Sequence, residues 1–204
     1  VFDYSFLLTC GYGEAALFKL VGDRYQLTQR QRYAVMRAAC SNQSLEYRQA
    51  HEAAHLQNKP YLVIDGFNLL ITLESALSGG CLFEGRDGCY RDLASLHSSY
   101  KRVMETLPAI DLIGQYCEHW EWPPLYWYLD RPVSNSGKLK AYLDAEAEKN
   151  GWPWQVSLVN SPDYELKRST HPVVTTDSYI LDNASEWVNL ARWLIQSAIP
   201  EAWV

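Results

Sequence analysis

A short apolar run that ends in an aspartate constrains the fold of this chain more than any other feature. Residues 61–65 read Tyr-Leu-Val-Ile-Asp, and a Gly-Phe-Asn triplet that ends at Asn68 follows directly. Residues 69–77 have a helix-like composition and stop before the glycine pair at 79–80. We therefore predict a buried strand, a tight turn and a helix with Asn68 as its N-cap. A strand that passes into a helix this quickly is typical of an α/β sheet.

Three later segments also lead from a strand-like run to an aspartate. Residues 125–130 end at Asp130, residues 172–177 end at Asp177, and residues 155–160 lead to Asp163 in the first turn of the next segment. In open parallel sheets, ligands bind outside the carboxyl ends of the strands. We therefore expect these three aspartates and Asp65 to converge at one edge of the sheet.

A ring of carboxylates of this kind indicates a cation site. Like charges packed together raise one another's pKa and destabilise a fold unless a cation or protons compensate. Mg2+ and Mn2+ prefer hard oxygen ligands, bind few carboxylates, and keep water ligands beside a phosphate substrate. The sequence therefore predicts Mg2+ or Mn2+ as the cofactor and metal-assisted phosphodiester chemistry as the reaction.

The order of the predicted elements indicates two domains. Strands alternate with helices over residues 60–200, which predicts a doubly wound, three-layer α/β sheet of mostly parallel strands. Residues 1–58 are helical in composition, so we expect a small helical N-terminal domain before an α/β domain at 59–204. In the N-terminal domain, one helix is expected to stop at Gly22 and another to begin after the N-cap Thr28.

Two arginines on that second helix have two readings. Arg30 and Arg37 share one helix face, where they would either contact a nucleic-acid backbone or form a solvated face, which is the more common outcome.

The middle and the end of the chain complete the expected order. Residues 81–92 are polar and contain glycine, so we predict a loop that leads into a helix with Leu93, Leu96 and Tyr100 on its apolar face. After Asp177 we predict a turn at residues 178–182 and a closing helix at residues 186–197.

Composition excludes several classes of protein. The 204 residues suffice for one good core, and 48% of them are hydrophobic. A formal net charge of −6 argues against nonspecific coating of nucleic acid. Five cysteines without a CxxC pair fit reduced thiols in a cytoplasmic protein. No apolar run approaches membrane-spanning length, so we expect no membrane association.

The segment His51-Glu-Ala-Ala-His55 matches the HExxH pattern of zinc peptidases. Two histidines one helical turn apart can bind Zn2+, and Glu74 downstream is a conceivable third ligand. The context is poor, because residues 57–60 end the expected helix and lead straight into the strand. We therefore favour a surface helix with two ordinary histidines.

Charged residues in the predicted loop at 81–92, and Lys138 further along the chain, have both structural and functional interpretations. Asp87 and Asp92 would be an N-cap and a first-turn acid of the following helix, or metal-site acids. Arg86 and Arg91 could position a phosphate. Lys138 could meet a phosphate at the start of another helix.

Together, four of these segments resemble the PIN-like nuclease superfamily, most closely its NYN and FEN-type branches, which open with Asp-Gly-x-Asn. The segments are Asp65-Gly-Phe-Asn68, Asp130 after its strand, Asp163 at a helix start, and Thr175-Thr-Asp177-Ser178 at the end of the last strand. The resemblance covers about residues 60–200 and implies a PIN-like, Rossmann-like sheet. Residues 20–32 look like part of a small helical domain of unknown function that precedes such domains.

By position, the resemblance assigns metal-ligand roles to Asp65, Asp163 and Asp177, with Asp130 as a further acid. It also implies that Asn68 orients Asp65 or a substrate phosphate. For the mid-chain acid of the family there are three competing residues, which are Glu74, Asp87 and Asp92.

The hypotheses fall into different classes. The leading one is a Mg2+- or Mn2+-dependent endoribonuclease that cleaves single-stranded or structured RNA. The alternative is a noncatalytic RNA- or protein-binding PIN-like module whose acids are structural caps, because fold does not decide activity. The zinc peptidase is the third. The substrate's identity and the oligomeric state, a homodimer included, stay open at this point.

Overall fold

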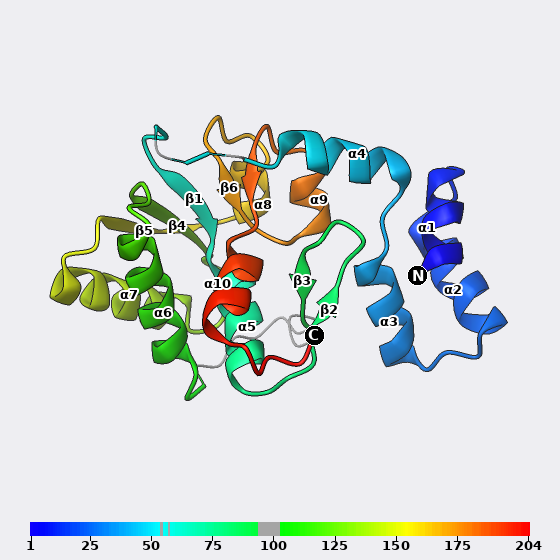
Figure 1. Ribbon diagram of the computed structural model, residues 1–204, viewed down its shortest axis with the longest axis horizontal. Coiled ribbons are helices and arrows are strands. Elements are labelled where there is room, and N and C mark those ends of the chain that lie inside the picture. The colour runs from blue at the N-terminus through cyan, green and yellow to red at the C-terminus, as the bar shows by residue number, and fades with distance from the viewer. Residues whose placement is uncertain (54, 57, 94–102) are drawn as a thin grey trace.

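The computed structural model describes residues 1–53, 55–56, 58–93 and 103–204 (Figure 1). A five-stranded sheet with the order β5-β4-β1-β6-β7 forms its centre, and every neighbouring pair of strands is parallel. The strands are β1 Leu62–Asp65, β4 Leu125–Asp130, β5 Trp154–Val159, β6 Val173–Val174 and β7 Trp187–Val188. Because all five run in one direction, their carboxyl ends meet at one edge. The α/β class and the parallel sheet predicted from the sequence are confirmed.

Helices cover both faces of the sheet (Figure 1). One face packs on α5 Gly66–Leu77, α6 Thr106–His119, α7 Ser136–Asn150 and α10 Leu190–Ala198. The other face packs on α8 Pro162–Leu166 and α9 Ser178–Leu181. Alternation along β1 explains the division: Leu62 and Ile64 belong to the large core, and Val63 to the small one.

The N-terminal region is helical, as predicted. Its helices are α1 Phe2–Thr9, α2 Glu14–Arg24, α3 Gln29–Ala38 and α4 Asn42–His51. The first three lie beside the α/β part and share a core of Tyr4, Leu17, Val21 and Ala39, while α4 runs from them towards the sheet (Figure 1). Thr28 caps α3 as predicted, in a capping box with Gln31.

Several boundaries differ from the expectations. The α5 helix begins at Gly66 with Asp65 as its N-cap residue, so the prediction that Asn68 is the N-cap was wrong. Gly22 does not stop α2, which runs to Arg24. A Cβ on Gly22 would lie 2.3 Å from Arg32 Nη1, so the glycine leaves room for that guanidinium.

Three further segments differ in type. The predicted loop at 81–92 contains an antiparallel hairpin of β2 Phe83–Glu84 and β3 Tyr90–Arg91. The predicted turn at 178–182 is α9, and the predicted closing helix begins only at Leu190 because Trp187–Val188 is strand β7. The helix predicted after Asp92 falls mainly on residues 94–102, outside the described residues.

Among the residues that the structure describes, no helix is both long and apolar enough to span a bilayer.

Candidate active site

A cavity of about 860 Å3 lies at the carboxyl edge of the sheet, and all four strand-end aspartates line it. They are Asp65 at the end of β1, Asp130 at the end of β4, Asp163 in α8 and Asp177 after β6. Another part of the lining comes from the N-terminal helices and includes Met36, Arg37, Ser44 and Arg48. The structure therefore brings together acids that are far apart in sequence, and it adds the N-terminal region to the same cavity.

Asp65 is the most strongly perturbed acid of this cavity. Burial raises its pKa to about 7; the hydrogen bond from Thr175 lowers it, and the charges of Asp177 and Asp163 raise it further. The Thr175 hydroxyl donates to Asp65 Oδ2 over 2.7 Å and accepts from the backbone N–H of Asp177 over 3.1 Å. One threonine thus links the carboxylate of Asp65 to the chain at Asp177.

Asn68, on α5, binds the backbone and side chain of Thr176, next to Asp177. Its side-chain oxygen accepts from the backbone N–H of Thr176 at 2.8 Å and from the Thr176 hydroxyl at 3.0 Å. Asp177 in turn caps α9 by accepting from the N–H groups of Tyr179 and Ile180. The side chain of Asn68 therefore positions the chain beside Asp177, and only its backbone N–H reaches Asp65.

Asp130 and Asp163 continue the electrostatic coupling across the cavity. Partial burial, and then the charge of Asp163, raise the pKa of Asp130. Partial burial, and then the charge of Asp177, raise the pKa of Asp163. Ser161 caps the helix that carries Asp163. Each of these acids therefore lies in the electrostatic field of at least one other, which favours a bound cation.

The carboxylates that line the cavity are the kind of oxygen ligand that a divalent cation prefers. Among the described residues, no three His, Cys, Asp or Glu side chains already stand close enough together to hold a metal. Mg2+ is commonly bound through one or two carboxylates and several waters. Asp65, Asp163 and Asp177 offer hard oxygen ligands. Their negative charges repel one another and help to raise the pKa of Asp65 and Asp163, so these residues fit an ion that retains water ligands.

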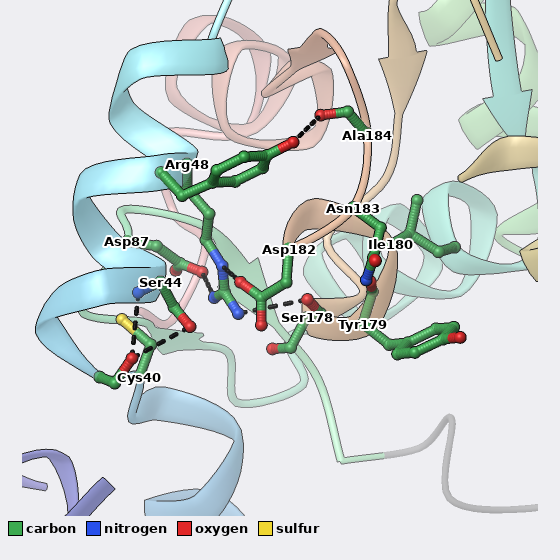
Figure 2. Close-up of polar contacts among 12 residues, drawn as sticks. Cys40, Ser44, Arg48, Asp87, Ser178, Tyr179, Ile180, Asp182, Asn183 and Ala184 are labelled. Carbon is green, nitrogen blue, oxygen red and sulfur yellow. Dashed lines mark hydrogen bonds and ion pairs between the residues drawn. The ribbon is translucent and has the colours of Figure 1, made fainter. Parts of the chain in front are cut away.

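The mid-chain acids lie elsewhere, and none of them is among the described residues that line the cavity. Asp87 is buried between two guanidinium groups. Arg91 donates to both of its oxygens at 2.9 and 2.6 Å. Arg48 donates to Asp87 Oδ2 (Figure 2). Burial alone would raise the pKa of Asp87, but Arg91 and Arg48 lower it to about 2. Asp87 precedes strand β3 and not a helix, so it is not a helix N-cap. Its charge is already compensated by two guanidinium groups, which leaves little attraction for a metal ion.

The other two mid-chain candidates are also buried. Glu74 accepts a hydrogen bond from Thr106 at 2.5 Å. Asp92 is only 2% exposed and lies near Arg37, whose pKa burial lowers and Asp92 partly restores.

The two arginines predicted to position a phosphate both donate hydrogen bonds within the protein, and Arg91 also lines the cavity. Arg86 donates to the carbonyl of Cys40 and to Asn42 on the N-terminal region. Arg91 is 3% exposed and donates from Nε to the carbonyl of Thr176 at 2.8 Å. Lys138 is exposed in the first turn of α7, and of the two arginines on α3, Arg30 is exposed while Arg37 lines the cavity.

Arg48 holds the segment that follows Asp177, and the sequence reasoning missed it. Its guanidinium lies between Asp87 and Asp182, donating to Asp182 at 2.8 Å and to the carbonyl of Ser178 at 3.2 Å (Figure 2). Arg91 donates to the carbonyl of Thr176, so two buried arginines bind the backbone on either side of Asp177. No local pattern around Arg48 indicates this role, because its acidic partners lie 39 and 134 residues away.

The HExxH segment lacks the geometry of a zinc site. Helix α4 ends at His51, with Glu52 as its C-cap in an extended conformation that bridges to Trp187. His51 and His55 therefore do not stand one turn apart on a helix, which the zinc hypothesis requires.

Fold and site together define an α/β protein with a parallel five-stranded sheet, an acidic cavity at its carboxyl edge, and an N-terminal helical region that lines part of the cavity. The chain belongs to the family described as Domain of unknown function (DUF5616), which matches residues 53–193. A second family, Protein of unknown function (DUF434), matches residues 1–51. An uncharacterized protein of Methanocaldococcus jannaschii is 30% identical over 199 residues, which cover 97% of this chain and 93% of that protein. No solved structure matches the chain.

Proposed function

We propose that this protein is a Mg2+- or Mn2+-dependent nuclease of the PIN-like type that hydrolyses phosphodiester bonds in RNA. The observation that carries the proposal is the convergence of Asp65, Asp130, Asp163 and Asp177 on one cavity. Three of these acids have pKa values raised by burial and by one another. A site that concentrates negative charge in this way is suited to a divalent cation and to the phosphate that the cation would bind.

In this proposal, different residues of the cavity bind the metal ion, position its ligands and bind the substrate phosphate. Asp65, Asp163 and Asp177 would hold the ion, with Asp130 as a further acid at the rim. The bound ion would supply an activated water and stabilise the charge on the leaving oxygen. Hydrogen bonds of 2.7 to 3.0 Å from Thr175 to Asp65 and from Thr176 to Asn68 hold Asp65 and the segment before Asp177 in position. Arg37 on α3 also lines the cavity and would pair with a substrate phosphate.

Cleavage of a labelled single-stranded RNA in Mn2+ tests this proposal. We expect Asp65→Asn and Asp177→Asn to lower the cleavage rate by at least about 100-fold. The matched control is Asp144→Asn on α7, where the exposed carboxylate pairs only locally with Lys140 at 2.7 Å. Equal rates in all four proteins would reject the nuclease assignment.

Thermal unfolding with added Mn2+ separates the nuclease from the noncatalytic alternative. A cation that binds the folded state raises its melting temperature. We expect this increase in wild type and in Asp144→Asn, and little of it in Asp65→Asn. An RNA- or protein-binding module without a metal site predicts no increase in any of them, together with unchanged RNA binding in the Asp65 and Asp177 variants.

A further inference from the structure

Two exposed tyrosines and two cations form a compact surface cluster next to the acidic cavity. The cluster, here called the tyrosine platform, consists of Tyr164, Lys167, Arg168 and Tyr179. Tyr164 on α8 is 49% exposed, and Tyr179 on α9 is 54% exposed. Tyr179 also lines the cavity itself. The platform is therefore continuous with the candidate active site.

The two cations hold the rings in place. Lys167 donates to the Tyr179 hydroxyl at 2.8 Å, and its Nζ lies 5.1 Å from the Tyr179 ring centroid and 5.9 Å from that of Tyr164. Arg168 donates to the Tyr164 hydroxyl at 2.8 Å, and its guanidinium carbon lies 4.9 Å from that ring centroid. The aromatic surfaces are thus pre-arranged, which reduces the entropy lost when a ligand binds them.

Packing of the core does not require these tyrosines. The apolar contacts of α8 and α9 come from Leu166 and Ile180, which are fully buried. The tyrosines neighbour the acids of the cavity in sequence, since Tyr164 follows Asp163 and Tyr179 lies two residues after Asp177. Large aromatic side chains that stay exposed beside positive charge are the features by which proteins bind single-stranded nucleic acid.

We propose that the tyrosine platform binds single-stranded nucleic acid and delivers it to the acidic cavity. Bases stack on Tyr164 and Tyr179, and phosphates pair with Lys167 and Arg168. Positive charge on the platform offsets the repulsion between the strand and the acids next to it. Because every base has an aromatic face, binding depends little on sequence, and a duplex binds more weakly because its bases are already stacked. The ligand class rests on the proposed function, but binding is measurable without cleavage.

Fluorescence anisotropy of a labelled oligouridine of about 12 nucleotides tests the platform, in EDTA so that no cleavage occurs. We expect Tyr164→Ala and Tyr179→Ala each to weaken binding by roughly 10-fold, and Tyr164→Phe and Tyr179→Phe to keep it, because stacking needs the ring. The matched control is Tyr25→Ala, which removes a tyrosine that is 52% exposed with Arg24 over its ring, outside the residues that line the cavity. Lys167→Gln should reduce the dependence of log K on log salt by about 0.7.

The outcomes separate this inference from the nuclease assignment. Alanine variants that bind as tightly as wild type, a duplex that binds as tightly as the single strand, or polyphosphate that competes as well as the oligonucleotide would each overturn the platform. If the alanine variants lose binding while wild type does not cleave RNA in Mn2+, the platform stands and the nuclease assignment fails. If they bind normally while Asp65→Asn abolishes cleavage, the reverse holds.

Discussion

Asp65 carries a charge that the fold does not favour. Its carboxylate is largely removed from water and lies in the field of Asp177 and Asp163. The hydroxyl of Thr175 and the backbone N–H of Asn68 compensate for this only in part. As a result its pKa of about 7 lies well above the value of 3.8 for an unperturbed aspartate. A buried acid of this kind is typical of functional sites, because no requirement of packing explains it.

The raised pKa of Asp65 predicts a pH dependence of stability in metal-free solution. The unfolded chain loses this proton near pH 4 and the folded chain only near pH 7, so the folded state binds more protons in between. The stabilising contribution is therefore complete below about pH 4 and is lost as the pH rises through about 7. Asp65→Asn removes this loss and keeps an oxygen acceptor for Thr175. After a discount for partial exposure, we expect it to raise the free energy of unfolding at about pH 8 by roughly 2 kcal/mol.

Urea unfolding in EDTA at several pH values, followed by tryptophan fluorescence, measures this difference. The relevant quantity is the difference between wild type and Asp65→Asn, because Asp130 and Asp163 titrate with raised pKa values in both proteins. Asp144→Asn should run parallel to wild type. A difference that does not change with pH would show that Asp65 has an ordinary pKa.

At the scale of elements, the junction of β1 and α5 decides where Asp65 lies. The strand ends at Asp65 and the helix begins at Gly66, with no loop between them. A Cβ on Gly66 would lie 2.4 Å from Leu129 Cδ2 and 3.0 Å from the carbonyl oxygen of Tyr128, both on the neighbouring strand β4. Leu129 is fully buried and has little room to move. Glycine thus allows the turn to pass close against β4.

We predict that Gly66→Ala destabilises the protein by about 1–3 kcal/mol, because the added methyl group overpacks a filled core. If Asp65 binds the metal, the same variant should also lose Mn2+-dependent cleavage, since relief of the clash moves the end of β1. The control is Gly137→Ala in α7, where a Cβ would meet no atom within 4 Å.

Urea titration of both glycine variants measures the two effects. Gly137→Ala should leave stability unchanged or raise it by up to about 1 kcal/mol, because alanine favours a helix. A Gly66→Ala protein as stable as wild type would contradict the crowding argument.

At the scale of the whole molecule, Arg48 joins the N-terminal helices to the α/β part. It lies in α4, yet its ionic partners are Asp87 in the hairpin and Asp182 at the end of α9 (Figure 2). Its carbonyl also accepts a hydrogen bond from the buried Trp187 indole at 2.7 Å. Because both parts of the chain line the cavity, this connection holds the site together as well as the fold.

We predict that Arg48→Ala lowers the free energy of unfolding by about 3 kcal/mol, since it leaves Asp87 buried with one cation in place of two. All eight tryptophans lie between Trp120 and Trp203, so the midpoint of their fluorescence transition reports the unfolding of the α/β part. A loss of stability seen by tryptophan fluorescence, from a substitution in α4, would demonstrate coupling between the parts. Arg30→Ala, on the exposed face of α3, should change stability by less than about 0.5 kcal/mol.

Two transitions in the wild-type protein, one by far-ultraviolet circular dichroism and one by tryptophan fluorescence, would argue against this coupling. So would an Arg48→Ala protein whose tryptophan transition coincides with that of wild type.

Local patterns predicted the elements that bear the acids. Apolar runs that end in aspartate identified β1 and β4, and the serine-proline start of α8 placed Asp163 in a first turn. The two-residue strand β7 was missed because Trp187 faces the core equally well in a helix or a strand. Asn68 was assigned to the wrong position because amide side chains favour helix N-caps, whereas here the amide binds Thr176 across the sheet edge.

The sequence by itself determined that strands and helices alternate, and therefore that the strands are parallel and their terminal acids share an edge. Short apolar runs and strand-end polar residues are local signals, readable without coordinates. Only the tertiary structure decided that the N-terminal helices line part of the cavity, that Asp87 and Arg91 neutralise each other, and that the pKa of Asp65 is raised. Those properties depend on distances between residues far apart in the chain, and burial and charge act through space along no local pattern.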